Sequence, residues 1–182
     1  MQIIHTPIEG LVILEPRIFH DTRGYFYESY NQQKMKELGI DTIFVQDNQS
    51  YSQKGVIRGL HFQKPPFAQA KLVRVIKGKV LDVAVDIRKS SPTYGQHFSI
   101  ILTGENHRQF LIPEGFAHGF VALEDDSIFT YKCSQFYHKE AEMSIRYNDP
   151  TLNINWGLDE TPIMTEKDLC GVLFDQFNTP FE

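Results

Sequence analysis

The feature that most constrains the fold is a series of short strand-like segments between residues 55 and 134. Each is rich in branched and aromatic residues, and turn sequences such as Lys77-Gly78, Thr103-Gly104-Glu105 and Pro113-Glu114-Gly115 separate them. The expected strands are 55–63, 71–76, 79–87, 96–102, 109–112, 117–123 and 127–134. Short strands at this regular spacing predict an all-β fold, a sandwich or a barrel. We expect 71–76 and 79–87 to pair as a hairpin.

The flanking regions predict fewer regular elements. Further strands are expected at 11–14, 25–30 and 42–46, the last followed by a turn at Asp47-Asn48. Residues 31–38 favour a short helix, because Asn31 is a good N-cap and Gly39 can end the helix. The regular spacing of strand-like segments is lost after Tyr137, and the tail from Ile163 is expected to pack across the barrel. We find no repeat or linker, so residues 1–182 are expected to form a single domain.

Charge and cysteine content exclude several classes of protein. The net charge is -5, which argues against a general nucleic-acid surface, and an anionic ligand would need a local basic cluster. Two cysteines, Cys133 and Cys170, suggest neither a disulfide scaffold nor a zinc site. The N-terminus lacks the features of a signal peptide, and no apolar run approaches the ~18 residues of a membrane span. The expected compartment is the cytoplasm.

The strand at 55–63 carries the most suggestive residue, His61. In a regular strand His61 shares a face with Ile57, Gly59 and Gln63, and Gly59 leaves room there for a ligand. Arg58 then lies on the opposite face, unless Gly59 forms a bulge that breaks the alternation. His61 alone could equally be a hydrogen-bonded core histidine.

A second histidine, His118, lies at the start of the strand at 117–123, as in small β-barrels of the cupin type that bind metals. A metal site needs three or four nitrogen or oxygen ligands close together, and here His61 is followed by Gln63 rather than by a second ligand. We therefore expect no metal. Without a metal, His61 could act as an acid or base, with Asp82 or Asp168 orienting its ring. Asp82 could instead be a solvated acid at the barrel mouth.

Other residues could supply a proton donor and anion-binding groups. Tyr131 is expected on a strand of the barrel, and a phenol opposite an imidazole could deliver a proton to the other face of a substrate. Cations that could bind phosphate oxygens are scattered along the chain; they are Arg23, Arg58, Lys71, Arg74 and Lys167. Taken singly, Tyr131 could be a packed aromatic and the cations solvated surface charges.

Together these segments resemble the dTDP-4-dehydrorhamnose 3,5-epimerase family. The matching motifs span nearly the whole chain in order and include 19–26, 46–48, 58–63, 71–75, 82–86, 112–120, 131–134 and 165–168. The resemblance implies a cupin-like jelly roll with a short helix and a C-terminal extension. It also implies a homodimer, no metal or organic cofactor, and a place in dTDP-rhamnose biosynthesis for cell-surface polysaccharide.

The resemblance also implies roles for individual residues. His61 matches the general base, Tyr131 the general acid, and Asp168 the partner of the base, with Asp82 as second choice. Lys71 matches a cation beside the C4 oxygen of the substrate, and Tyr137 an aromatic that stacks on the thymine. Positions that match the rest of the nucleotide-sugar site are Arg23, Phe26, Glu28, Gln46, Asp47, Asn48, Arg58, His118, Glu142 and Lys167.

Three alternatives stay open. The same base and acid would serve an enzyme that epimerises only C3 or C5, or isomerises the ketone. The barrel could be a non-catalytic sugar-nucleotide binding module, or a metal-dependent cupin. Ala70 and Phe136 depart from the residues common in the family, which leaves fine substrate preference open.

Overall fold

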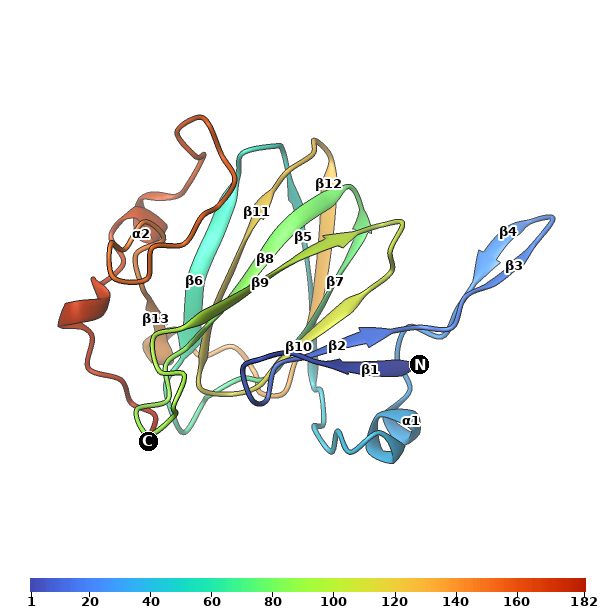
Figure 1. The fold of residues 1–182 in the computed structure, drawn as a ribbon, viewed down its shortest axis with the longest axis horizontal. Coiled ribbons are helices and arrows are strands. Elements are labelled where there is room, and N and C mark those ends of the chain that lie inside the picture. Colours follow the sequence, from blue (N-terminus) through green and yellow to red (C-terminus); the bar gives the residue numbers. More distant parts are fainter.

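The computed structural model describes residues 1–182, and two antiparallel β-sheets facing each other form its centre (Figure 1). One sheet has the strand order β1-β2-β10-β7-β12-β5, and the other has the order β13-β6-β11-β8-β9. The first sheet consists of β1 (Gln2–His5), β2 (Val12–Glu15), β10 (Gln109–Ile112), β7 (Lys71–Lys77), β12 (Ser127–Cys133) and β5 (Gln46–Ser52). The second consists of β13 (Glu142–Ser144), β6 (Ile57–Gln63), β11 (Phe116–Ala122), β8 (Lys79–Asp86) and β9 (His97–Thr103).

The main apolar core lies between the two sheets. Phe110 and Phe129 enter it from the six-stranded sheet, and Phe116 and Phe120 enter it from the five-stranded sheet. Since side chains alternate along a strand, each sheet supplies every second residue to this core. The predicted all-β class is confirmed, and the two layers are compatible with a jelly roll.

The C-terminal segment covers the outer face of the five-stranded sheet. Figure 1 shows this segment beside β6. Leu60 and Phe62 of β6 belong to the same apolar cluster as Trp156 and Phe174. The predicted position of the tail is therefore confirmed. This cover also brings the short helix α2 (Glu166–Leu169) against β6.

Helix α1 (Gln32–Glu37) packs under the outer face of the six-stranded sheet. The Asn31 side chain accepts a hydrogen bond from the Lys34 amide at 3.2 Å, so the predicted N-cap is correct. Met35 buries its side chain against Leu14 and Leu72. Neither α1 nor α2 is long or apolar enough to cross a membrane.

Two sequence-based predictions about the strands of the two sheets are wrong. β7 and β8 do not form a hairpin, because they belong to different sheets and the chain crosses between them at Gly78. Gly78 has φ +79°, and a Cβ there would lie 2.5 Å from the Ser127 hydroxyl. The strand expected at 42–46 instead begins at Gln46 and runs to Ser52. This edge strand pairs only with β12 and is polar, so its sequence resembles a loop.

A short hairpin projects from the sheets and forms an exposed arm (Figure 1). It consists of β3 (Phe19–Asp21) and β4 (Gly24–Phe26), whereas the sequence predicted one longer strand at 25–30. Its large aromatic side chains face solvent, and Phe26 is 71% exposed. The base of the arm is anchored, because Tyr27 accepts a hydrogen bond from Arg74 at 2.9 Å and its ring lies 5.0 Å from that of His107.

Candidate active site

A bulge in β6 sets the direction of the residues around His61. Gly59 and Leu60 of β6 lie opposite the single residue Gly119 of β11, so the register shifts between them. A Cβ on Gly59 would lie 2.5 Å from the Cα of Gly119, so the close approach of the two strands requires glycine at this position. The extra residue breaks the alternation and puts Arg58 and His61 on the same inner face, where both line one cavity.

The bulge also corrects the predicted neighbours of His61. Ile57 was expected on the same face as His61, but it packs on the outer face with Leu60 and Phe62. Gln63 does share the inner face and lines the pocket beside His61, as predicted. The correction follows from the single residue inserted at Gly59.

The inner faces of the sheets enclose two neighbouring cavities of about 370 Å³ and 110 Å³. Five side chains line both cavities: Asn48, His61, Lys71, Tyr131 and Glu142. The imidazole of His61 and the phenol of Tyr131 therefore reach one space from opposite sheets. Arg58, His118 and Asp168 line the larger cavity as well.

Asp168 engages one nitrogen of His61. The Nε2 atom of His61 lies 2.6 Å from Oδ1 of Asp168, which is only 5% exposed on α2. Burial acts to raise the pKa of the Asp168 carboxyl, but the hydrogen bond to His61, together with contributions from Lys167 and Thr165, outweighs burial and holds that pKa below its usual value. None of the hydrogen bonds in the structure uses Nδ1 of His61, so this nitrogen is available to a ligand.

Asp82, the second predicted partner of His61, pairs with His118 instead. Both carboxylate oxygens of Asp82 lie within 3.0 Å of Nε2 of His118, and Asp82 is fully buried rather than solvated at the barrel mouth. Burial lowers the pKa of His118, and the neighbouring Asp82 carboxylate partly opposes this shift. His61 and His118 face each other across β6 and β11, each with its own carboxylate. The structure contains no group of three or more His, Cys, Asp or Glu side chains arranged to hold a metal ion.

Lys71 is a buried lysine without a carboxylate in direct contact. Its Nζ donates to the backbone carbonyl of His61 at 3.3 Å, and its side chain lines both cavities. Burial lowers the pKa of the Lys71 ammonium, while Cys133, Asp82 and Glu142 oppose the shift. Burial also raises the pKa of the Tyr131 phenol, which therefore keeps its proton at neutral pH.

A polar rim surrounds the smaller cavity. Tyr137 donates through its hydroxyl to Glu142 at 2.7 Å, and its backbone amide donates to Oε1 of Gln46 at 2.9 Å. Lys167 lies 2.5 Å from the same carboxylate of Glu142. Gln46 also donates to Asn48 at 3.1 Å. The structure thus brings these five predicted residues together with His61.

Arg58 is directed along the wall of the larger cavity by the end of β5. Its Nε donates to the Ser52 hydroxyl at 3.2 Å, and one terminal nitrogen donates to the Tyr51 carbonyl at 3.1 Å. No carboxylate neutralises this guanidinium, so its charge is available to an anionic ligand.

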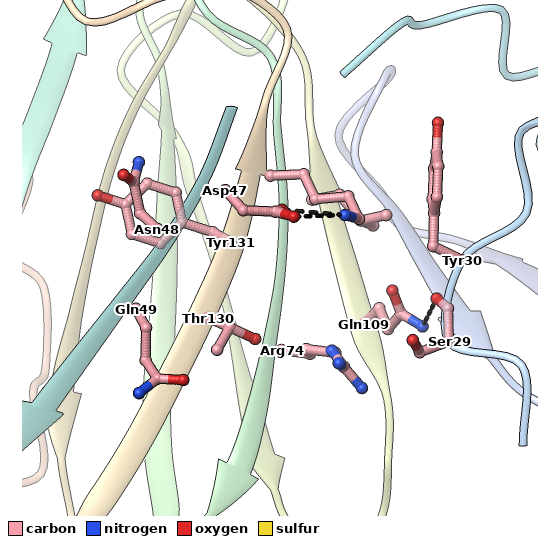
Figure 2. Close-up of a pocket in the computed structure, with 11 residues that line it drawn as sticks. Ser29, Tyr30, Asp47, Asn48, Gln49, Arg74, Gln109, Thr130 and Tyr131 are labelled. Atoms are coloured by element: carbon pink, nitrogen blue, oxygen red, sulfur yellow. Dashed lines mark hydrogen bonds and ion pairs between the residues drawn. The ribbon is translucent and has the colours of Figure 1, made fainter. Parts of the chain in front are cut away.

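Four predicted binding residues are not brought into this site. Arg23 and Phe26 lie on the exposed arm, Glu28 follows it, and none of them lines a cavity with His61. Asp47 lies on the outer face of the six-stranded sheet, where it forms an ion pair with Lys132 at 2.9 Å (Figure 2). Alternation along β5 explains Asp47, because its neighbour Asn48 points to the inner side.

Some lining residues were missed by the sequence reasoning. Ser50 and Gln49 come from β5, and the stacked rings of Phe120 and Phe129, 4.1 Å apart, form an apolar wall. The Ser50 hydroxyl is buried and has no hydrogen-bond partner in the protein. The alternation of Gln46, Asn48 and Ser50 would have revealed this face if the polar strand had been recognised.

Comparison with known proteins identifies the family of the chain. The family model described as dTDP-4-dehydrorhamnose 3,5-epimerase matches residues 5–176. The epimerase of that name from Salmonella typhimurium is 51% identical, with 97% of each chain covered.

Two solved structures also match along nearly the whole chain. The Legionella pneumophila dTDP-6-deoxy-D-glucose-3,5-epimerase, in complex with dTDP-4-keto-L-rhamnose, has a TM-score of 0.94 at 52% identity, covering 97% of this chain and 94% of its own. ChmJ, a 3'-monoepimerase from Streptomyces bikiniensis in complex with dTDP-quinovose, has a TM-score of 0.89 at 31% identity, covering 94% and 87%.

Proposed function

The chain belongs to the dTDP-4-dehydrorhamnose 3,5-epimerase family, and we propose that it inverts C3 and C5 of dTDP-4-dehydro-6-deoxy-D-glucose to give dTDP-4-dehydro-L-rhamnose. The observation that carries this proposal is that His61, Tyr131 and Lys71 together line the same two neighbouring cavities. These are a base, an acid and a cation, the three groups that the reaction requires.

The substrate chemistry explains this requirement. The C4 ketone acidifies the hydrogens on C3 and C5, because removal of either gives an enolate whose charge rests on the C4 oxygen. Inversion then requires that a proton leaves from one face of the sugar and that another arrives on the opposite face. A base and an acid on opposite sides of the ring meet this condition.

His61 serves as the base in this proposal. Because Asp168 engages Nε2, the free Nδ1 is the nitrogen that accepts the proton from carbon. The resulting imidazolium is stabilised by the Asp168 carboxylate, which also fixes the ring orientation. Proton transfer of this kind typically contributes about 10²–10⁴-fold in rate.

Tyr131 and Lys71 complete the reaction. The Tyr131 phenol, which keeps its proton in its buried position, donates that proton to the opposite face of the enolate carbon. The Lys71 ammonium stabilises the negative oxygen at C4, where one preorganised donor is typically worth about 3–4 kcal/mol. Arg58 and Lys167 would bind the diphosphate, and Tyr137 would stack on the thymine.

The proposed activity can be tested by incubating the protein with the 4-keto sugar nucleotide in D₂O. We expect deuterium at both C3 and C5 of the product, because each new C–H bond receives a proton exchanged with solvent. Mass spectrometry and proton NMR of the recovered sugar nucleotide measure the label and its position. Tight dTDP binding without any solvent exchange would indicate a non-catalytic binding module instead.

The same measurement addresses a second candidate, an epimerase that acts on one centre. The match to ChmJ at 31% identity is the observation that favours this second candidate, because ChmJ is a 3'-monoepimerase with a similar fold. This candidate predicts label at one centre only. The base, acid and cation would be the same in both enzymes, so the orientation of the sugar decides between them.

We also propose that the protein acts as a homodimer in which the arm of one subunit enters the site of the other. The arm carries the Arg23 and Phe26 side chains, both highly exposed and remote from His61 of the same chain. An isolated hairpin with exposed aromatics gains stability by packing against another surface. In a two-fold dimer each subunit would provide that surface for the arm of the other. The arm would then place Arg23 and Phe26 beside the partner's nucleotide site.

Mixed dimers test this arrangement. We expect low activity from His61→Asn and from the double variant Arg23→Ala/Phe26→Ala when each is made alone. Coexpression of the two should restore about one quarter of the wild-type rate, because half of the dimers are mixed and each holds one intact site. Activity that stays at the sum of the two parents would contradict the exchange of arms.

A further inference from the structure

The Gln63 side chain joins two segments at the end of β6 through three hydrogen bonds. Its Nε2 donates to the carbonyl of Phe67 at 2.7 Å and to the carbonyl of Phe136 at 3.2 Å. Its Oε1 accepts from the backbone amide of His138 at 2.7 Å. Gln63 is only 3% exposed, so these bonds are shielded from water. One amide therefore satisfies backbone groups on both sides of Tyr137.

Other contacts join the same two segments. The ring of Phe67 stacks on His138, with centroids 3.8 Å apart and planes within 13°. Gln69 donates to the carbonyl of Gln135 at 2.7 Å, and the Ser134 hydroxyl accepts from the Ala70 amide at 2.8 Å. Residues 134–138, which we term the rim loop, are therefore held along their length by residues 63–70.

We propose that Gln63 is a positioning residue for nucleotide binding, which acts by holding the rim loop so that Tyr137 presents its ring to the nucleobase. This inference rests on the proposed function, since it assumes the dTDP-sugar site at that rim. Tyr137 is 54% exposed, so the direction of its ring depends on the backbone of the loop and on its bond to Glu142. Gln63 fixes that backbone on both sides of Tyr137.

The position of Gln63 also links the nucleotide to the reacting sugar. It lies two residues after His61 on the same strand and the same inner face. The nucleobase site is thereby set at a fixed distance from the proposed base. Loss of the side chain should weaken binding of the nucleotide and leave the proton-transfer groups in place.

The test compares Gln63→Met with wild type and repeats the comparison in a Tyr137→Ala background. Methionine has similar length but cannot form the three hydrogen bonds. We expect the Kd for dTDP, measured by calorimetry, to rise about 10-fold in the wild-type background, within the range caused by loss of one base–aromatic stack. The KM should rise in parallel while kcat changes little. In the Tyr137→Ala background the same change should have little effect, because the two residues act as a unit.

Two further variants keep the test decisive. Phe67→Leu weakens the stacking on His138 that also holds the rim loop. It should raise the Kd in the same way, and it replaces Gln63→Met if that variant does not fold. Ile57→Val, a buried change on the opposite face of β6, should leave dTDP binding unchanged. An unchanged Kd, an equal rise in both backgrounds, or a fall in kcat with normal affinity would each overturn the inference. A wild-type protein that does not bind dTDP would overturn the proposed function itself.

Discussion

Replacement of His61 by Asn is expected to reduce both epimerisation and solvent exchange by orders of magnitude while preserving the affinity for dTDP. Asparagine cannot accept a proton from carbon, so neither C3 nor C5 would be deprotonated. We expect turnover to fall by about 10²–10⁴-fold or more, the range associated with one acid–base group. The nucleotide contacts proposed for Tyr137, Arg58 and Lys167 would remain.

Deuterium incorporation measures this loss directly, and calorimetry with dTDP measures binding. His5→Asn is the matched control, because His5 lies on β1 and lines neither cavity. Full turnover in His61→Asn would refute the assignment of the base. Loss of dTDP affinity together with turnover would show that His61 serves binding, or that the variant is misfolded, which a melting curve distinguishes.

Much of the fold could be predicted because the core strands are rich in branched and aromatic residues, which makes them recognisable in the sequence. The expected strands at 96–102, 109–112, 117–123 and 127–134 agree with β9 to β12 within two residues. The edge strand β5 could not be recognised in the same way. Its inner face lines a polar cavity instead of the core, so it needs no apolar residues. The polar residues by which β5 lines the cavity are the same residues that make its sequence resemble a loop.

Pairing partners were harder to predict than strands. The turn at Gly78 looks like a hairpin turn, yet it carries the chain from one sheet to the other. Local sequence specifies that the chain turns there, but the partner of each strand depends on how the two sheets pack. The same limit applies to β13, whose three residues form a strand only because β6 lies beside them.

Some residues of the candidate site could also be predicted from sequence, whereas others depend on the tertiary fold. Motifs predicted His61, Lys71 and Tyr131, and the structure brings all three to one cavity. Strand alternation alone put Arg58 on the wrong face, and only the bulge at Gly59 resolves that conflict. The choice between Asp82 and Asp168 depends on the tertiary fold, because each lies far from His61 in sequence and both are buried acids.

Replacement of Tyr131 by Phe is expected to separate solvent exchange from inversion. The base would still remove a proton from C3 or C5, because Phe retains the shape of the ring and leaves His61 and Asp168 in place. The enolate would then receive a solvent-derived proton from the same imidazolium on the same face, which restores the starting configuration. We therefore expect deuterium to enter the recovered substrate while formation of the epimer falls by about 10²–10⁴-fold.

This outcome distinguishes the two proposed roles more sharply than activity alone. NMR of the recovered sugar nucleotide in D₂O reports label and configuration together, and Tyr94→Phe serves as a control because Tyr94 packs on Phe174 away from the cavity. In His61→Asn neither label nor inversion is expected, whereas in Tyr131→Phe label should persist without inversion. Inversion at the wild-type rate in Tyr131→Phe would remove the phenol from the mechanism. Simultaneous loss of label and inversion would mean that Tyr131 holds the substrate instead of delivering a proton to its second face.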